Sequence, residues 1–163
     1  MNVFMRYVRD FAKHLILIAL AVVVAYTGKS FSCSRVDASF KGMLPDVENG
    51  ETLLIDRRPA WTGEFRPGEA ICFTFASGSD LLTWAGRVAA VPGQTFEVKD
   101  NALIVNGKQY KSQHAPSVER FNVPPVMVPR GHLLVKFNAR PNGVKRLQQH
   151  LVPLSAVRGR IIR

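Results

Sequence analysis

An apolar run near the N-terminus, LILIALAVVVAY at residues 15–26, constrains this chain more than any other feature. Extended to residues 11–27, it reaches about 17 residues, which is the lower limit for a helix that crosses a bilayer. That count requires Lys13 and His14 to extend toward the lipid headgroups. Basic residues precede the run, and this arrangement predicts a cytoplasmic N-terminus with the rest of the chain translocated.

A retained anchor and a cleaved signal peptide are both compatible with this layout. The sequence YTGK at residues 26–29 follows the run and offers no convincing cleavage site between small residues. We therefore predict a retained anchor. The expected organisation is a basic cytoplasmic N-terminus at residues 1–13, a transmembrane segment at residues 14–32 and an external domain at residues 36–163.

The net charge of +10 and the pI near 10.2 indicate an anionic partner. The sequence contains no zinc-finger spacing, no convincing helix-turn-helix and no aromatic-rich basic stripe, so we do not expect nucleic acid. A basic surface beside a membrane is the simpler interpretation, with membrane lipid as a partner.

Cysteine and histidine give no sign of a metal site. Cys33 and Cys72 form no C-x-x-C pair, and we expect each to act as a small apolar residue, although a disulfide between them stays open. The four histidines have neither metal-ligand spacing nor an acidic partner nearby in the sequence. We predict no metal and no cofactor.

After residue 35 the pattern changes to short runs rich in Val, Ile, Leu and Phe, bounded by turn residues, which is typical of strands. These runs lie at residues 52–56, 69–76, 87–91, 95–99, 102–105, 133–137 and 157–162. Turn signals at residues 100–101 and 106–107 predict a hairpin within residues 96–110. We expect a proline-bearing loop at residues 111–129 and a weak helix at residues 144–151. The fold class is therefore mostly β.

Three stretches in a fixed order carry a resemblance to a known family. They read GMLPD at residues 42–46, RVAAVPGQ at residues 87–94 continuing through VNGKQY at residues 105–110, and VPRGH at residues 128–132 leading to VRGR at residues 157–160. Together they resemble the type I signal peptidase family. Its corresponding motifs read Ser-Met-x-Pro-Thr, Lys-Arg-Val-x-x-x-Pro-Gly-Asp and a closing Ile-x-Gly-Arg. The resemblance implies a single N-terminal transmembrane helix followed by a signal-peptidase-like β domain.

In this family a serine hydroxyl attacks the peptide bond after a signal sequence, and a neutral lysine acts as the general base. When the family's motifs are aligned with this sequence, Gly42 stands at the position of the catalytic serine (the serine column) and Gly86 at the position of the lysine (the lysine column). Neither glycine has a side chain to fill the role. A further oxyanion-binding serine is replaced by Phe40. Ser39 is a weak alternative nucleophile, because a shift of three residues moves a hydroxyl by several Å.

The resemblance still implies a surface on which an extended polypeptide pairs with strands through backbone hydrogen bonds, which needs no catalytic dyad. The residues expected to line this peptide-binding groove are Phe40, Gly42, Met43, Pro45, Arg87 and Asn138.

We therefore predict a membrane-anchored, catalytically inactive signal-peptidase-like protein. It would bind or chaperone an exported or pilin-like polypeptide in a secretion, conjugation or pilus system. The expected location is the bacterial inner membrane, with the main domain periplasmic. The alternative is an active signal peptidase with a displaced nucleophile, and a third interpretation is a structural subunit of a secretion complex.

Overall fold

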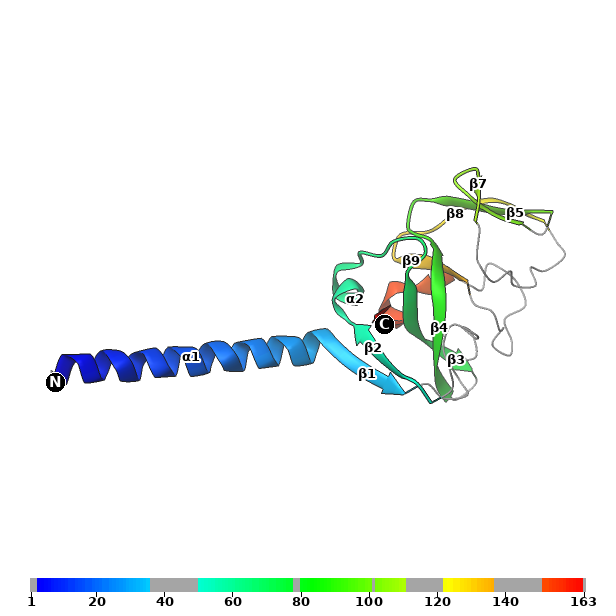
Figure 1. Cartoon of the computed structure of the whole chain (residues 1–163). Coiled ribbons are helices and arrows are strands. Elements are labelled where there is room, and N and C mark those ends of the chain that lie inside the picture. The colour runs from blue at the N-terminus through cyan, green and yellow to red at the C-terminus, as the bar shows by residue number, and fades with distance from the viewer. Residues whose placement is uncertain are drawn as a thin grey trace.

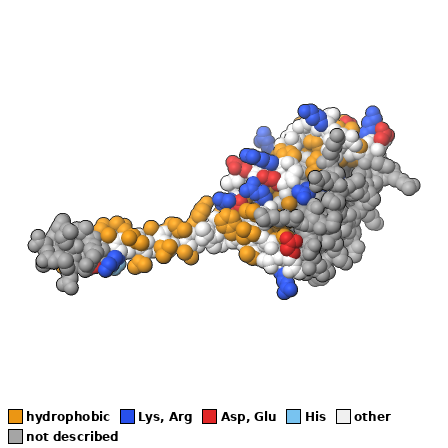
Figure 2. All heavy atoms as spheres, in the orientation of Figure 1, with side chains coloured by type: hydrophobic (Ala, Val, Ile, Leu, Met, Phe, Trp, Pro, Cys, Tyr) orange, Lys and Arg blue, Asp and Glu red, His pale blue; other side chains and the backbone are white. Residues whose placement is uncertain are grey.

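A computed structural model describes residues 3–35, 50–77, 80–100, 102–110, 122–136 and 151–162. Its first element is the long helix α1, Val3–Ser30, which projects from a β domain (Figure 1). Residues Asp10–Ser30 of this helix are long and apolar enough to cross a membrane, judged by length and composition, and this stretch is exposed except for its last residue, Ser30, which is buried. Apolar side chains predominate along the part of α1 between its charged residues near the N-terminus and the domain (Figure 2). A cleavable signal would satisfy the same criteria.

The main sheet has seven strands in the order β1-β2-β11-β3-β4-β9-β10, and every described neighbour pair is antiparallel. The strands are β1 Phe31–Arg35, β2 Thr52–Asp56, β3 Ala70–Ser77, β4 Asp80–Ala90, β9 His132–Lys136, β10 Leu151–Pro153 and β11 Val157–Ile162. β1 follows α1 directly, so the β domain begins five residues before the start expected from the sequence. A short 3-10 helix, η3 Leu154–Ala156, separates β10 from β11.

A second sheet of four strands has the order β7-β6-β5-β8. It comprises β5 Thr95–Lys99, β6 Ala102–Val105, β7 Lys108–Gln109 and β8 Val123–Met127. The hairpin predicted within residues 96–110 is confirmed. Asp100 and Asn106 adopt positive φ at its two turns, where short polar side chains tolerate the left-handed conformation.

The expectation of a loop throughout residues 111–129 is wrong for its second half, because β8 lies there. Pro124 and Pro125 had argued against a strand, since proline has no N–H to donate. β8 accommodates them because it is an edge strand that pairs only with β5 among the described residues, and both prolines are exposed. The helix expected at residues 144–151 lies outside the described residues, except for Leu151, which begins β10.

Apolar side chains pack on both faces of the main sheet. Phe73, Trp84 and Val135 belong to a cluster on one face, and the opposite face buries Leu53 with Cys72 and their neighbours. A third cluster, which includes Phe96 and Leu134, joins the second sheet to the first. Each fully buried large apolar side chain contributes roughly 1.5–3 kcal/mol. The predicted mostly β fold is thus confirmed.

The two cysteines behave differently. Both are free thiols, with Cys72 buried in β3 and Cys33 exposed on β1. Burial raises the pKa of the Cys72 thiol to about 11. Burial of Cys72 in an apolar strand fits the expectation of a small apolar residue there, whereas Cys33 lies on β1 at the edge of the sheet, where side chains are less covered.

Candidate functional site

Gly86, at the lysine column of the family resemblance, is buried within β4 and lies opposite Ile71 of β3. Its neighbours two residues away along the strand, Trp84 and Val88, belong to the same apolar cluster as Ile71. Because side chains alternate along a strand, a side chain at position 86 would point into this cluster. Glycine places no titratable group there.

Arg87 is the one residue of the predicted peptide-binding groove that the structure describes. It lies opposite Lys136 of β9, on the face of β4 that Gly86 does not share. Its guanidinium donates to the Gly68 carbonyl at 3.3 Å. The other predicted groove residues, which are Phe40, Gly42, Met43, Pro45 and Asn138, lie outside the described residues, as does the alternative nucleophile Ser39.

Lys136 is a half-buried cation that sequence reasoning missed. Its ammonium lies 5.1 Å from the centroid of the Tyr110 ring, within cation–π range. Burial lowers the pKa of Lys136 and raises the pKa of Tyr110. A lysine of this kind has one attribute of a general base, but Lys136 lies opposite Arg87 and therefore on the other face of the main sheet from Gly86. The only sequence signal was a lysine at the end of the apolar strand HLLVK.

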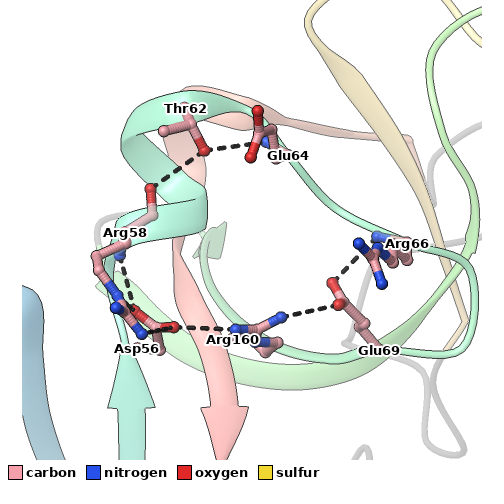
Figure 3. A network of polar contacts seen from close by, with 7 residues as sticks. All are labelled: Asp56, Arg58, Thr62, Glu64, Arg66, Glu69 and Arg160. Carbon is pink, nitrogen blue, oxygen red and sulfur yellow. Dashed lines mark hydrogen bonds and ion pairs between the residues drawn. The ribbon is translucent and has the colours of Figure 1, made fainter.

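A second polar network, also missed, surrounds Asp56 at the end of β2 (Figure 3). The Asp56 carboxylate is almost fully buried and accepts from the Arg58 guanidinium at 2.8 and 2.9 Å. Arg160 of β11 donates to the same carboxylate at 3.0 Å and to Glu69 at 3.0 Å. The hydrogen bonds from Arg58 hold the pKa of Asp56 at about 2, below its ordinary value of 3.8, although burial opposes the shift.

The Asp56 network also holds a short helix, α2 Arg58–Thr62. Asp56 accepts the Arg58 backbone N–H at 3.1 Å, so its side chain satisfies one of the unpaired donors at the helix start. Gly63 ends the helix in the left-handed conformation and donates to the Pro59 carbonyl at 2.8 Å. Proline within the first turn fits a helix start, but five residues are too few to produce an apolar periodicity that sequence reasoning can detect.

The closing VRGR motif has a structural explanation in the same place. A Cβ on Gly159 would meet the backbone oxygen of Asp56, and it would lie 2.8 Å from Ile55 Cγ2. Only glycine allows β11 to approach β2 this closely, and Arg160 then reaches the Asp56 carboxylate. The glycine and arginine of this motif therefore hold strands together.

Two clefts open beside α2. The larger, of about 820 Å³, is lined by the Asp56 network, and its three arginines are matched by three acids. The smaller, of about 510 Å³, includes Ser32, Arg57, Trp61 and Arg158 in its lining, and no acid is among the described residues that line it. Neither cleft contains a predicted groove residue among those that the structure describes.

The outer edge of β1 is a feature suited to binding a polypeptide, and of the sheet edges it is the one whose strand leads into the GMLPD segment. β1 pairs with β2 over five residues, and within the described part of the chain no strand pairs with its other edge. Such an edge presents N–H and C=O groups to which an extended chain can add. The stretch after β1 leads to the GMLPD motif at residues 42–46.

Comparison with known proteins finds several that are similar to this chain. Signal peptidase I T of Bacillus subtilis (strain 168) is 26% identical over 137 residues, which cover 78% of this chain and 70% of that protein. Probable signal peptidase I-1 of Synechocystis sp. is 28% identical, with 77% and 67% covered. For Signal peptidase I P of Bacillus subtilis subsp. natto, which is 26% identical, the chain spans 51% of the relative's length.

A crystal structure of a signal peptidase I from Enterococcus faecalis V583 aligns with a TM-score of 0.45 at 21% identity, covering 61% of this chain and 97% of that one. The signal peptidase family, peptidase S26, matches residues 10–159. This match takes in the predicted span and nearly all of the β domain. The chain therefore belongs to the signal peptidase family, peptidase S26.

Proposed function

We propose that this protein is a membrane-anchored member of the family that binds an exported polypeptide without cleaving it. The observation that carries the proposal is Gly86, a buried glycine in β4 where the resemblance expects the lysine base. A general base must come within about 2.6–3.2 Å of the proton donor it serves. Glycine offers no such group, and the sequence places a second glycine, Gly42, at the serine column.

The binding half of the proposal rests on β1. Its outer edge carries backbone donors and acceptors, and the chain beyond it leads toward Gly42, Met43 and Pro45. An extended segment of an exported or pilin-like polypeptide would add to this edge as a strand. In the proposed topology α1 lies in the bacterial inner membrane, with its N-terminus cytoplasmic and the β domain periplasmic. The resemblance suggests a secretion, conjugation or pilus system as the context.

Cys33 provides a direct test because it is an exposed thiol on β1, whereas Cys72 is buried with a raised pKa. A thiol-directed photocrosslinker will therefore attach to Cys33 alone in the folded protein. We expect the full chain, reconstituted in vesicles, to crosslink through Cys33 to a radiolabelled precursor that carries a signal sequence. The precursor should stay uncut.

The matched control is Cys33→Ser combined with Lys99→Cys, which moves the thiol to an exposed position on the second sheet. Adducts at both positions would mean random collision, and no adduct at Cys33 would reject the strand-addition site. Specific cleavage of the precursor would reject the inactive assignment and favour the rival, an active peptidase with a displaced nucleophile. Loss of that cleavage in Ser39→Ala would identify the nucleophile.

A further inference from the structure

The smaller cleft, which we call the α2 groove, combines positive charge with an exposed tryptophan at the base of α1. Arg57 and Arg158 both line it, and neither has an acidic partner among the described residues. Arg158 Nε donates to the Thr74 hydroxyl at 2.9 Å, which fixes this guanidinium at the groove. Trp61 also lines the groove and is 55% exposed.

The charge of the α2 groove sets it apart from the larger cleft. There, Asp56 and Glu69 already engage Arg58 and Arg160, so no net charge is left for a ligand. The described lining of the α2 groove has two arginines, hydroxyl groups that include those of Ser32 and Thr74, and no acid. Guanidinium groups with nearby hydroxyls match the chemistry of a phosphate.

The level of the α2 groove relative to a bilayer follows from α1. The predicted span Asp10–Ser30 has 21 residues, and at 1.5 Å per residue it is about 31 Å long, close to the roughly 30 Å thickness of a hydrocarbon core. Ser30 therefore lies at the boundary between hydrocarbon and headgroups. Its carbonyl accepts the Arg57 backbone N–H at 2.8 Å, so the start of α2 is tied to the end of the span.

A second contact holds α2 against the end of α1. The Arg58 guanidinium lies over the Phe31 ring, 5.0 Å from its centroid. Trp61 is four residues after Arg57, which is about 6 Å along a helix axis, and a headgroup layer is roughly 5–8 Å thick on each side. Figure 1 places α2 on the side of the domain from which α1 leaves. Whatever the direction of the α2 axis, an offset of this size keeps Trp61 close to the level of the headgroup layer, where tryptophan is enriched in membrane proteins.

We propose that the α2 groove binds the phosphate headgroup of an anionic phospholipid in the bilayer that α1 crosses, with Trp61 inserted among the neighbouring headgroups. This docking would fix the tilt of the β domain against the membrane and set the height of the β1 edge above it. The net charge of +10 is in keeping with an anionic lipid surface. The proposal depends on α1 spanning the bilayer and is independent of whether the protein cleaves peptides.

Tryptophan fluorescence of the full chain in vesicles tests the proposal, because Trp61 is exposed whereas Trp84, the other tryptophan, is buried. In phosphatidylglycerol-containing vesicles, lipids brominated near the headgroup should quench part of the emission. Trp61→Phe should abolish that quenching, and because Trp61 is exposed this substitution should leave the fold intact. In vesicles of phosphatidylcholine alone the quenching should fall.

Charge variants distinguish binding at the α2 groove from a general attraction of the basic protein to the membrane surface. Removing one arginine near an anionic membrane should raise the ratio of undocked to docked protein about five-fold. We expect this for Arg57→Gln and Arg158→Gln, and not for Lys99→Gln on the second sheet. Equal losses in all three variants, or Trp61 open to aqueous acrylamide in phosphatidylglycerol vesicles, would overturn the proposal.

Discussion

Asp56→Asn should destabilise the β domain in a manner that depends on pH. The carboxylate is 1% exposed and accepts from two guanidinium groups and one backbone N–H. Its pKa is about 2 in the folded protein against an ordinary value of 3.8. At 1.36 kcal/mol per pKa unit, this difference contributes about 2 kcal/mol to the free energy of unfolding at neutral pH.

Removing one partner of a fully buried ion pair lowers the free energy of unfolding by about 3–5 kcal/mol, because the remaining charge stays buried without a counter-charge. Here the side chains of Arg58 and Arg160 are 44% and 36% exposed, so water can solvate both after the substitution. The loss should therefore stay near the linkage value of about 2 kcal/mol.

The sign of the pH dependence follows from the lowered pKa. The stabilisation is fully present above the ordinary pKa of 3.8 and is lost as the pH falls through about 2. At pH 3 about half of it should remain, by the same linkage relation. Chemical denaturation of the full chain in non-ionic micelles, followed by tryptophan fluorescence, gives the free energy difference between wild type and variant at each pH.

Glu69→Gln is the matched control, because the Glu69 carboxylate pairs with one guanidinium, that of Arg160, and with the Arg66 backbone N–H, and its side chain is more exposed than that of Asp56. Its loss should stay below about 1 kcal/mol. The reasoning fails if the Asp56→Asn loss is no larger than the control loss at pH 7, or if it is the same at pH 7 and pH 3.

Further predictions concern the strands, the vestigial site, the cysteines and the topology. Gly159→Ala should cost about 3 kcal/mol or more in a denaturation experiment, because the new methyl group meets the β2 backbone; a loss below 0.5 kcal/mol, about the size of a neutral surface change, would contradict the close approach. Gly86→Lys should lower the melting temperature, since it buries an ammonium in an apolar cluster, and adding Gly42→Ser should yield no precursor cleavage in a gel assay; cleavage would mean that the surrounding groups still support the chemistry. A maleimide should modify Cys33 in the folded protein at pH 7 and Cys72 only after unfolding, which mass spectrometry resolves; early modification of Cys72 would contradict its burial. A reporter fused to the C-terminus should behave as translocated, and cytoplasmic activity of that fusion would reject the topology.

Much of the fold was predictable because its strands are short runs rich in β-branched and other apolar residues that end at recognisable turns. β2, β5, β6 and β11 match the predicted ranges. β8 was not predictable, because proline argues against a strand until its position at a sheet edge is known. α2 was missed because a helix of five residues has no measurable period.

The candidate site was predictable only in part. The motif order placed Gly86, and the structure puts it in the interior of β4. The Asp56 network joins residues 104 positions apart, so no local pattern could reveal it. Lys136 and Tyr110 likewise meet only after the second sheet packs against the first. Contacts of this kind depend on topology, which the spacing of charged residues does not encode.

The family-like residues that this chain keeps and those it lacks differ in what they do. Gly159 and Arg160 match the closing motif of the resemblance, and each has a definite structural task in joining β11 to β2. Gly42 and Gly86 occupy the two columns on which the resemblance places chemistry, and neither offers a group that could react. A chain that needs the domain as a scaffold, and not as a peptidase, requires the first pair and can dispense with the second. The same scaffold joins the end of α1 to α2 through the Ser30 carbonyl and pairs β1 with β2, and under the proposed function these contacts would hold the β1 edge beside the membrane.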